Sequence, residues 1–217
     1  MLLPANPLNL RGEYGNDFLQ YRHRFLTYYV YELPVGRGRR WLGHTNTVAD
    51  GVLGGWRLAG ITTYHSGEAL DVYLEDPGTK IGWWVGRADR VAGAPLYAGR
   101  QSSSHDTGNG VPWFNVNAFA PPQPWTYGNS APRLLFGPGF GNWDLSAMKS
   151  FRLPRGESNR LEFKADFFNL PNHYNLGDPN NCLADTRDGG NADPTCGKIY
   201  YGVGAPRLIQ LGLRLFF

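Results

Sequence analysis

The last ten residues constrain the fold of this 217-residue chain more than any other stretch. Alternate positions from Ile209 to Phe217 carry only apolar side chains, whereas the positions between them are mostly polar or small, as at Arg214. Because side chains of a β-strand point alternately to opposite faces, one face of this segment is purely apolar. The chain ends on an aromatic residue, while the termini of soluble domains are normally polar and frayed. We therefore expect a C-terminal strand whose apolar face is covered by lipid or by protein.

Composition supports an all-β fold. Aromatic residues make up 14% of the chain and charged residues only 18%, with 29 glycines and 16 prolines, which is typical of strands joined by long turns rather than of a helical bundle. No run of 18 apolar residues indicates a transmembrane helix, but barrel strands of about ten alternating residues escape such a search. The net charge of +3 is dispersed, so we expect no nucleic-acid partner.

Four further segments alternate in the same way and are rich in aromatic and β-branched residues, namely 24–33, 55–64, 142–151 and 160–168. We expect the second strand to continue through residues 70–74 beyond a bulge. The pattern predicts an all-β antiparallel meander of about five long amphipathic strands, part of, or assembling into, a larger β-barrel or sheet. The side chains expected to face the membrane or another subunit are Phe25, Tyr29, Tyr31, Trp56, Tyr64, Trp143, Leu161, Phe163, Phe167, Leu211, Leu213, Leu215 and Phe217.

The connections between the expected strands alternate in length. Residues 1–20 form a lead-in loop, and residues 21–217 form the strand segment with two long loops at about 75–141 and 171–206. The turn between the third and fourth strands is short. All long loops therefore emerge at one end, as in outer-membrane barrels with long extracellular loops and short periplasmic turns.

The long loops contain the candidate ligand-binding residues. The candidates all fall in the first loop and are Trp83, Trp84, Trp113, Trp125 and Tyr127. Loops of this length are usually functional or extend outside the scaffold. Two interpretations stay open: the aromatic side chains pack the loop on itself, or they stack on sugar rings or aromatic ligands.

Two shorter features also allow two interpretations each. Cys182 and Cys196 lie in one Gly/Asn/Asp-rich stretch, where a disulfide would contribute about 3 kcal/mol; the alternative is two separate thiols. Residues 36–41 form a basic turn with Arg37, Arg39 and Arg40, which is either a solvated turn that stops strand pairing or a contact for phosphates at a membrane surface.

Several motifs together resemble the C-terminal part of TonB-dependent outer-membrane receptors, with greatest similarity to the Oar-like type that carries a carboxypeptidase-regulatory-like N-terminal domain. The matching runs are YRHRF at 21–25, YVYELPVGRG at 29–38, LGGWRLAGI at 53–61, WFN at 113–115 with AF at 118–119, GPGFGNWD at 137–144, DFFNLPNH at 166–173 and LGLRLFF at 211–217. The resemblance implies a role in importing a bulky ligand across the Gram-negative outer membrane, with the long loops at the ligand mouth. It also implies that the barrel-assembly machinery contacts the C-terminal strand ending in Phe217.

The family pattern includes a signal peptide, an energy-coupling box, a plug domain and about 22 strands; residues 1–7 do not match a signal peptide. About eight strands are needed to close a barrel, and an open sheet leaves unsatisfied edges in lipid. We therefore expect the remaining barrel strands, or further copies of the chain, as partners besides outer-membrane lipid.

Three hypotheses follow. The chain is the C-terminal barrel segment of a TonB-dependent receptor, a self-assembling structural β-protein that forms an oligomeric barrel or an extracellular filament, or a glycan-binding module that uses loop tryptophans. No spacing of Ser, His and Asp, no phosphate loop and no metal-ligand pattern stands out, so we expect no enzymatic activity, no cofactor and no metal.

Overall fold

The computed structural model describes residues 6–17, 21–74, 86–97, 108–153, 159–183 and 193–217. The chain divides into two compact units. The strand unit comprises residues 24–64, 141–173 and 205–217, and the loop unit comprises residues 1–23, 65–140 and 174–204. Each unit is described by itself.

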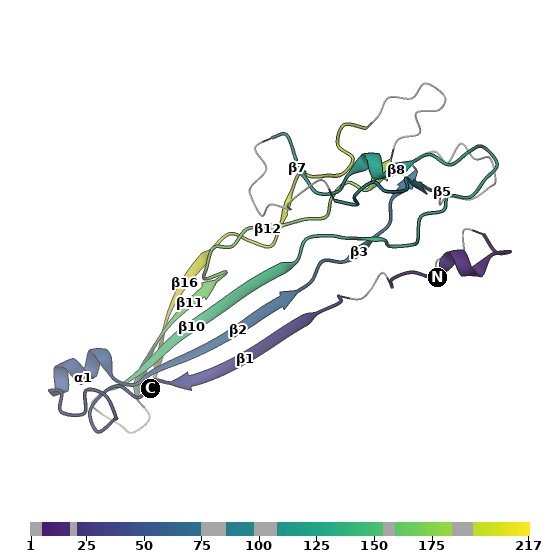
Figure 1. The fold of residues 1–217 in the computed structure, drawn as a ribbon. Helices are drawn as coiled ribbons and strands as arrows, with labels where there is room; N and C mark the ends of the chain where they lie inside the picture. Colours follow the sequence, from purple (N-terminus) through teal and green to yellow (C-terminus); the bar gives the residue numbers. More distant parts are fainter. Residues whose placement is uncertain (1–5, 18–20, 75–85, 98–107, 154–158, 184–192) are drawn as a thin grey trace. The chain divides into compact units, whose positions relative to one another are not determined.

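The strand unit is built on one five-stranded sheet with the order β1-β2-β10-β11-β16 (Figure 1). The strands are β1 (Arg24–Glu32), β2 (Trp56–His65), β10 (Phe140–Arg152), β11 (Arg160–Phe168) and β16 (Leu208–Phe216). Sequence neighbours among these strands are also neighbours in the sheet, so the expected five-stranded antiparallel meander is confirmed. The sheet is open among the described residues, because no described strand pairs with the outer edge of β1 or of β16.

Strand register brings the apolar positions of neighbouring strands together. Phe163 of β11 lies opposite Leu213 of β16 and opposite Lys149 of β10. At the other side of the sheet, Leu33 N donates to Trp56 O at 2.9 Å, which aligns β1 with β2. Because residues directly opposite one another share a face, Leu161, Phe163 and Phe167 of β11 share a side with Leu211, Leu213 and Leu215 of β16. We call this side of the sheet the apolar face.

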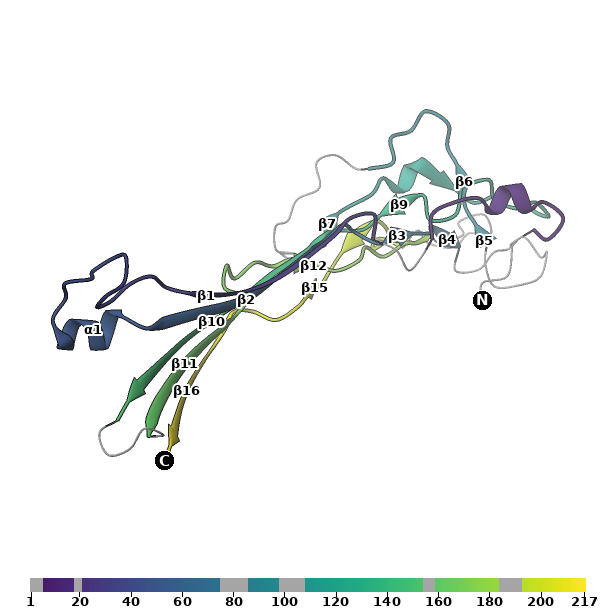
Figure 2. The ribbon, with the colours of Figure 1, turned by 90° about the horizontal axis from the view of Figure 1, so that it is seen from below.

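The opposite face of β10, β11 and β16 is polar. Glu162 lies opposite Arg214, and Lys164 Nζ lies 2.9 Å from Asp166 Oδ2. On β1 the same side of the sheet is mixed, since Tyr28 and Val30 are exposed there. The alternating pattern thus separates polar from apolar side chains most cleanly at the C-terminal half of the sheet. Figure 2 shows how these three strands twist away from β1 and β2.

A tyrosine–glycine contact joins the first strands on the apolar face. The Tyr29 ring covers Gly60, where an added Cβ would lie 2.4 Å from Tyr29 Oη. Trp143 Nε1 donates to Tyr29 Oη at 2.8 Å. Glycine at position 60 therefore allows the ring to lie flat across β2 and to reach β10.

Lys149 interrupts the apolar face of β10 but is buried. Its ammonium group donates to the carbonyl oxygen of Gly54 and lies 5.6 Å from the Trp56 ring centroid and 5.1 Å from that of Phe151. A carbonyl and two aromatic faces compensate the buried charge, and the contact fixes the residues before β2 against β10.

The loop unit contains short pairings rather than long strands. Its elements are η1 (Leu10–Glu13), β3 (Ala69–Leu70), β4 (Tyr73–Leu74), β5 (Gly86–Arg87), β6 (Asp89–Arg90), β7 (Val111–Pro112), η2 (Val116–Ala118), β8 (Phe119–Ala120), β9 (Leu135–Phe136), β12 (Asn175–Leu176), β13 (Cys182–Leu183), β14 (Lys198–Ile199) and β15 (Gly202–Val203). Buried Leu74, Leu135 and Ile199 mark two hydrophobic clusters that hold these pairs together.

The expected continuation of the second strand through residues 70–74 is wrong. β3 pairs with β9, and β4 pairs with β5 and β13 in a separate small sheet. The physical reason is burial. Ala69, Val72 and Leu74 all lie in the loop-unit core, so the apolar side chains of this segment pack in that core and not on the five-stranded sheet.

The connection between β1 and β2 contains the short helix α1 (Thr47–Leu53), which the sequence analysis did not predict. The side chain of Asn46 caps it by accepting a hydrogen bond from Ala49 N at 2.8 Å. Within the described residues, no helix has the length and hydropathy needed to cross a bilayer.

Candidate functional site

Trp113 serves loop packing. Its side chain is half-buried and packs against both hydrophobic clusters of the loop unit. Its Nε1 donates to Phe136 O at 2.8 Å, so the one polar atom of the ring is satisfied inside the unit. An indole with its N–H used in this way is a core residue rather than a ligand platform.

Trp125 and Tyr127 are exposed instead. Trp125 is 68% exposed and has a positive φ of 63°, and Tyr127 is 41% exposed. The turn that carries them is closed by Thr126, whose backbone N and Oγ1 donate to Gln123 O at 3.1 and 2.6 Å. The turn therefore presents two aromatic side chains outward. Trp83 and Trp84 lie outside the described residues.

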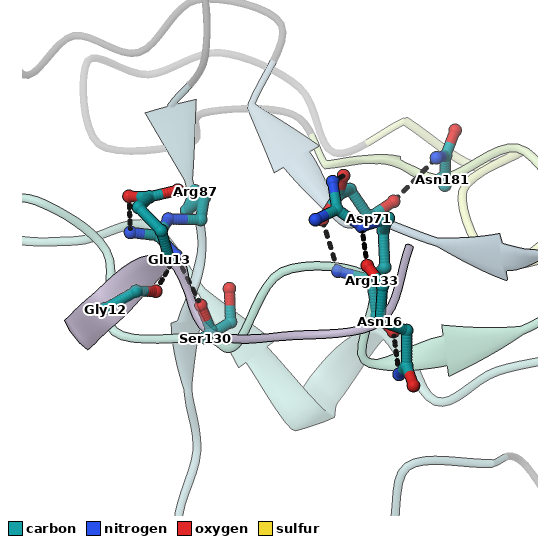
Figure 3. Close-up of polar contacts among 8 residues, drawn as sticks. All are labelled: Gly12, Glu13, Asn16, Asp71, Arg87, Ser130, Arg133 and Asn181. Carbon is teal, nitrogen blue, oxygen red and sulfur yellow. Dashed lines mark hydrogen bonds and ion pairs between the residues drawn. The ribbon is translucent and has the colours of Figure 1, made fainter. Parts of the chain in front are cut away.

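A buried arginine, Arg87, connects the N-terminal segment to Ser130 (Figure 3). Arg87 is 8% exposed. Its Nη1 donates to Gly12 O at 2.6 Å and to Ser130 O at 3.4 Å, and its Nη2 donates to Glu13 Oε1 at 2.9 Å. Its Nε has no hydrogen-bond partner among the described residues. One guanidinium thus joins two segments that are distant in the sequence.

A second set of polar contacts repeats the connection a few residues further on (Figure 3). Asn16 Nδ2 donates to Arg133 O at 2.8 Å, and Arg133 N donates to Asp71 Oδ1 at 2.5 Å. Asn181 Nδ2 donates to Asp71 O at 2.6 Å. Four segments of the loop unit therefore meet around Asp71 and Arg133.

These contacts bring a further aromatic residue to the same part of the loop unit. Tyr14, between Glu13 and Gly15, is 90% exposed, and a Cβ added at Gly15 would lie 2.3 Å from Pro132 O. The segment bearing Tyr14 thus packs on residues 128–133, directly after the turn with Trp125. Tyr14, Trp125 and Tyr127 are exposed aromatic residues of these segments, and we refer to the three together as the aromatic surface. Sequence analysis missed Tyr14 because it treated residues 1–20 as a lead-in; the only signal was an aromatic residue in a polar segment.

The expected disulfide between Cys182 and Cys196 is not present in the structure, in which both residues carry buried thiols. Cys182 lies in β13, paired with Tyr73 of β4, and Cys196 belongs to the larger hydrophobic cluster. Both therefore act as small apolar core residues. The polar stretch around them is held by hydrogen bonds instead, such as Asn180 Nδ2 to Asp193 Oδ2 at 2.8 Å.

Burial predicts that Cys196 is unreactive. Burial, followed by the charge of Asp193, raises the pKa of its thiol from 9.0 to about 12. The thiolate is the reactive form, so a shift of this size lowers its population at pH 8 on the order of 1000-fold. We expect Ellman's reagent to modify Cys196 slowly in the folded chain and rapidly in urea, as followed by mass spectrometry. Equal rates in the two states would contradict the buried position.

Two carboxylates of the loop unit have shifted pKa values. Hydrogen bonds from the Thr195 side chain and backbone lower the pKa of Asp193, whereas burial and the charge of Glu68 raise the pKa of Asp178. Among the described residues, no group of three or more His, Cys, Asp or Glu side chains is arranged to hold a metal ion.

The two units thus combine an open amphipathic sheet with a loop unit that presents an aromatic surface. A family model described as an outer membrane beta barrel domain matches residues 1–210. The chain belongs to this outer membrane β-barrel family. Searches of curated proteins and of solved structures each found no match.

Family membership explains the main features of the strand unit. An outer-membrane barrel needs strands that alternate between lipid and lumen, which is the separation seen on β10, β11 and β16. It also establishes the outer membrane as the location of this β-barrel protein.

Proposed function

We propose that the chain is the C-terminal barrel segment of a TonB-dependent outer-membrane transporter and that its role is non-catalytic. The observation that supports this most directly is the arrangement of connections. Residues 66–139 join β2 to β10 and residues 169–207 join β11 to β16, so both long connections leave the same end of the sheet. Large outer-membrane barrels carry their long loops on the extracellular side.

In this proposal the apolar face contacts lipid, and the edges of the sheet pair with the remaining barrel strands. Leu211 and Leu213 of β16 are exposed on that face, and Phe217 is almost fully exposed. The C-terminal strand, ending in Phe217, is the segment that the barrel-assembly machinery would bind, because its open edge offers backbone donors and acceptors.

The aromatic surface would form part of the extracellular ligand mouth. Tyr14 follows Gly12 and Glu13, which Arg87 contacts, and Trp125 and Tyr127 lie on the turn closed by Thr126, so the backbone that carries these side chains is ordered before binding. Flat aromatic side chains suit bulky solutes with ring faces, such as oligosaccharides or aromatic metal chelates.

We expect Trp125→Ala to weaken ligand binding by about 2 kcal/mol, the usual cost of losing an aromatic anchor, or roughly 30-fold. The measurement is binding, and energy-dependent uptake by whole cells, of labelled oligosaccharides and labelled metal chelates. Tyr28→Ala, which removes an exposed aromatic residue from the strand unit, is the control. Unchanged binding in Trp125→Ala would exclude this surface from the mouth, and uptake that does not require an energised inner membrane would contradict the TonB-dependent role.

A second candidate function is self-assembly, favoured by the open outer edges of β1 and β16. Exposed sheet edges are templates for strands of other copies, and repetition gives a ring or, where the rotation does not close, a filament. Size-exclusion chromatography with light scattering, in and out of detergent, separates the two candidates. A single monomeric peak in both conditions would exclude self-assembly.

A further inference from the structure

The connection between β1 and β2, residues 33–55, has a composition that the proposed transport role does not use. It carries three arginines, Arg37, Arg39 and Arg40, all exposed. Trp41 and Val48 are 57% and 78% exposed. None of the three arginines forms an ion pair with a described carboxylate.

The connection is ordered by its own hydrogen bonds and not by burial of these side chains. Trp41 N donates to Pro34 O at 3.0 Å, and Gly36 N donates to Trp41 O at 3.0 Å. Asp50 Oδ1 accepts from Arg37 N at 2.6 Å, which fixes the basic turn to α1. These backbone groups are therefore paired within the connection, while its cationic and apolar side chains are exposed.

The apolar side chains of the connection lie on α1 and on the basic turn together. Besides Trp41 and Val48, the exposed apolar residues are Leu42, Val52 and Leu53. Trp56 Nε1 donates to Val52 O at 2.9 Å, and Lys149 donates to Gly54 O. Through these contacts α1 is fixed to the end of the sheet that also carries the C-terminus (Figure 1).

The position of residues 33–55 at the end of the strands indicates which kind of partner they contact. Family membership puts the sheet in the outer membrane, so a segment at the end of its strands lies at a bilayer surface. Arginines beside tryptophan and aliphatic side chains match that surface, because cations attract anionic headgroups while apolar side chains enter the acyl boundary. Asp50 is the only acidic side chain in residues 33–55, and it is used by the turn.

We propose that residues 36–53 dock on a phospholipid leaflet and bind its anionic headgroups through Arg37, Arg39 and Arg40. The occupant is the glycerophospholipid surface at the end of the sheet that carries residues 33–55 and the connection between β10 and β11. Each arginine near an anionic surface strengthens binding about fivefold, so the three together contribute on the order of 100-fold.

The test uses the full chain, folded in zwitterionic detergent, with an environment-sensitive NBD fluorophore on Val48→Cys. Phosphatidylglycerol is titrated into the micelles and compared with phosphatidylcholine of the same acyl chains. We expect a blue shift of NBD emission with phosphatidylglycerol that is lost at high salt. The same fluorophore on Leu10→Cys, an exposed apolar position of the loop unit, should not respond, and the unsubstituted chain reports labelling of Cys182 and Cys196.

The triple variant Arg37→Gln/Arg39→Gln/Arg40→Gln should lose the phosphatidylglycerol response by on the order of 100-fold in half-saturating lipid. The control variant Arg11→Gln/Arg24→Gln/Arg207→Gln removes the same amount of charge from exposed positions elsewhere. It should retain the phosphatidylglycerol response. Circular dichroism checks the fold of each variant, and native mass spectrometry of the unsubstituted chain provides a second measurement, in which phosphatidylglycerol should be retained over phosphatidylcholine.

Three results would overturn the proposal. Equal responses to the two lipids would exclude headgroup recognition. A response to glycerol 3-phosphate alone would indicate a soluble anion, and a blue shift that grows with protein concentration without lipid would indicate a second copy of the chain as the occupant.

Discussion

Replacing Gly67 with alanine is expected to destabilise the loop unit by about 3 kcal/mol, the upper part of the range for overpacking. An added Cβ would lie 1.8 Å from Gly137 O and 2.8 Å from Pro138 O. Both are backbone atoms, which cannot rotate away as a flexible side chain can. The clash occurs where Gly137 N donates to Glu68 O at 2.8 Å, next to the β3–β9 pairing, so we expect that pairing to be lost.

Hydrogen–deuterium exchange resolved by mass spectrometry measures the effect locally. Peptides covering β3 and β9 should lose protection in Gly67→Ala, while β10, β11 and β16 keep theirs. Gly51→Ala is the matched control, since an added Cβ at this position of α1 has no heavy atom within 4 Å and alanine favours a helix. Unchanged exchange in β3 and β9 would contradict the close approach of the backbone at Gly67 to that at Gly137.

Removing the carboxylate of Glu13 is expected to destabilise the loop unit by about 3–5 kcal/mol, the cost of leaving a buried charge without its partner. Arg87 and Glu13 side chains are only 9% and 26% exposed. In Glu13→Ala the guanidinium keeps two backbone carbonyls, Gly12 O and Ser130 O, but loses its only described counter-charge. Urea unfolding of the loop unit, followed by exchange protection, measures the loss.

The double variant Arg87→Met/Glu13→Ala separates charge from packing. It removes both charges and keeps apolar volume at position 87, so it should recover part of the stability lost in Glu13→Ala. Arg57→Met tests an exposed pair, because its ion pair with Glu32 has both side chains more than half exposed, and it should cost no more than about 1 kcal/mol. A Glu13→Ala effect as small as that of Arg57→Met would contradict the buried ion pair.

The strands were predictable because the period-two alternation of apolar and polar side chains is a local property of the sequence. In β11, Phe163 and Phe167 lie on one side and Glu162 and Lys164 on the other. This alternation predicted both that the segment is a β-strand and which of its faces is apolar. The order of the strands was predictable because strands that follow one another in the chain usually pair as antiparallel neighbours. Thus the five-stranded sheet agrees with the sequence to within two residues at each end.

The loop unit was not predictable in this way because its structure depends on distant contacts. Arg87 meets Gly12 and Glu13 across more than seventy positions, and two-residue strands such as β4 and β13 have no periodicity to detect. The same limit explains the cysteines, whose polar neighbours suggested a covalent link while long-range packing buried both thiols. Helix α1 was missed because its signal is short, an Asn46 cap before seven residues.

The most direct measurement of whether the apolar face contacts lipid is a scan of spin-labelled cysteines along residues 209–215 of β16 in reconstituted vesicles, with the unsubstituted chain as labelling background. We expect collision with membrane-soluble oxygen to be high at 209, 211, 213 and 215, and collision with a water-soluble nickel complex to be high at 210, 212 and 214. Equal access of the nickel complex to both sets of positions would contradict a membrane-embedded sheet.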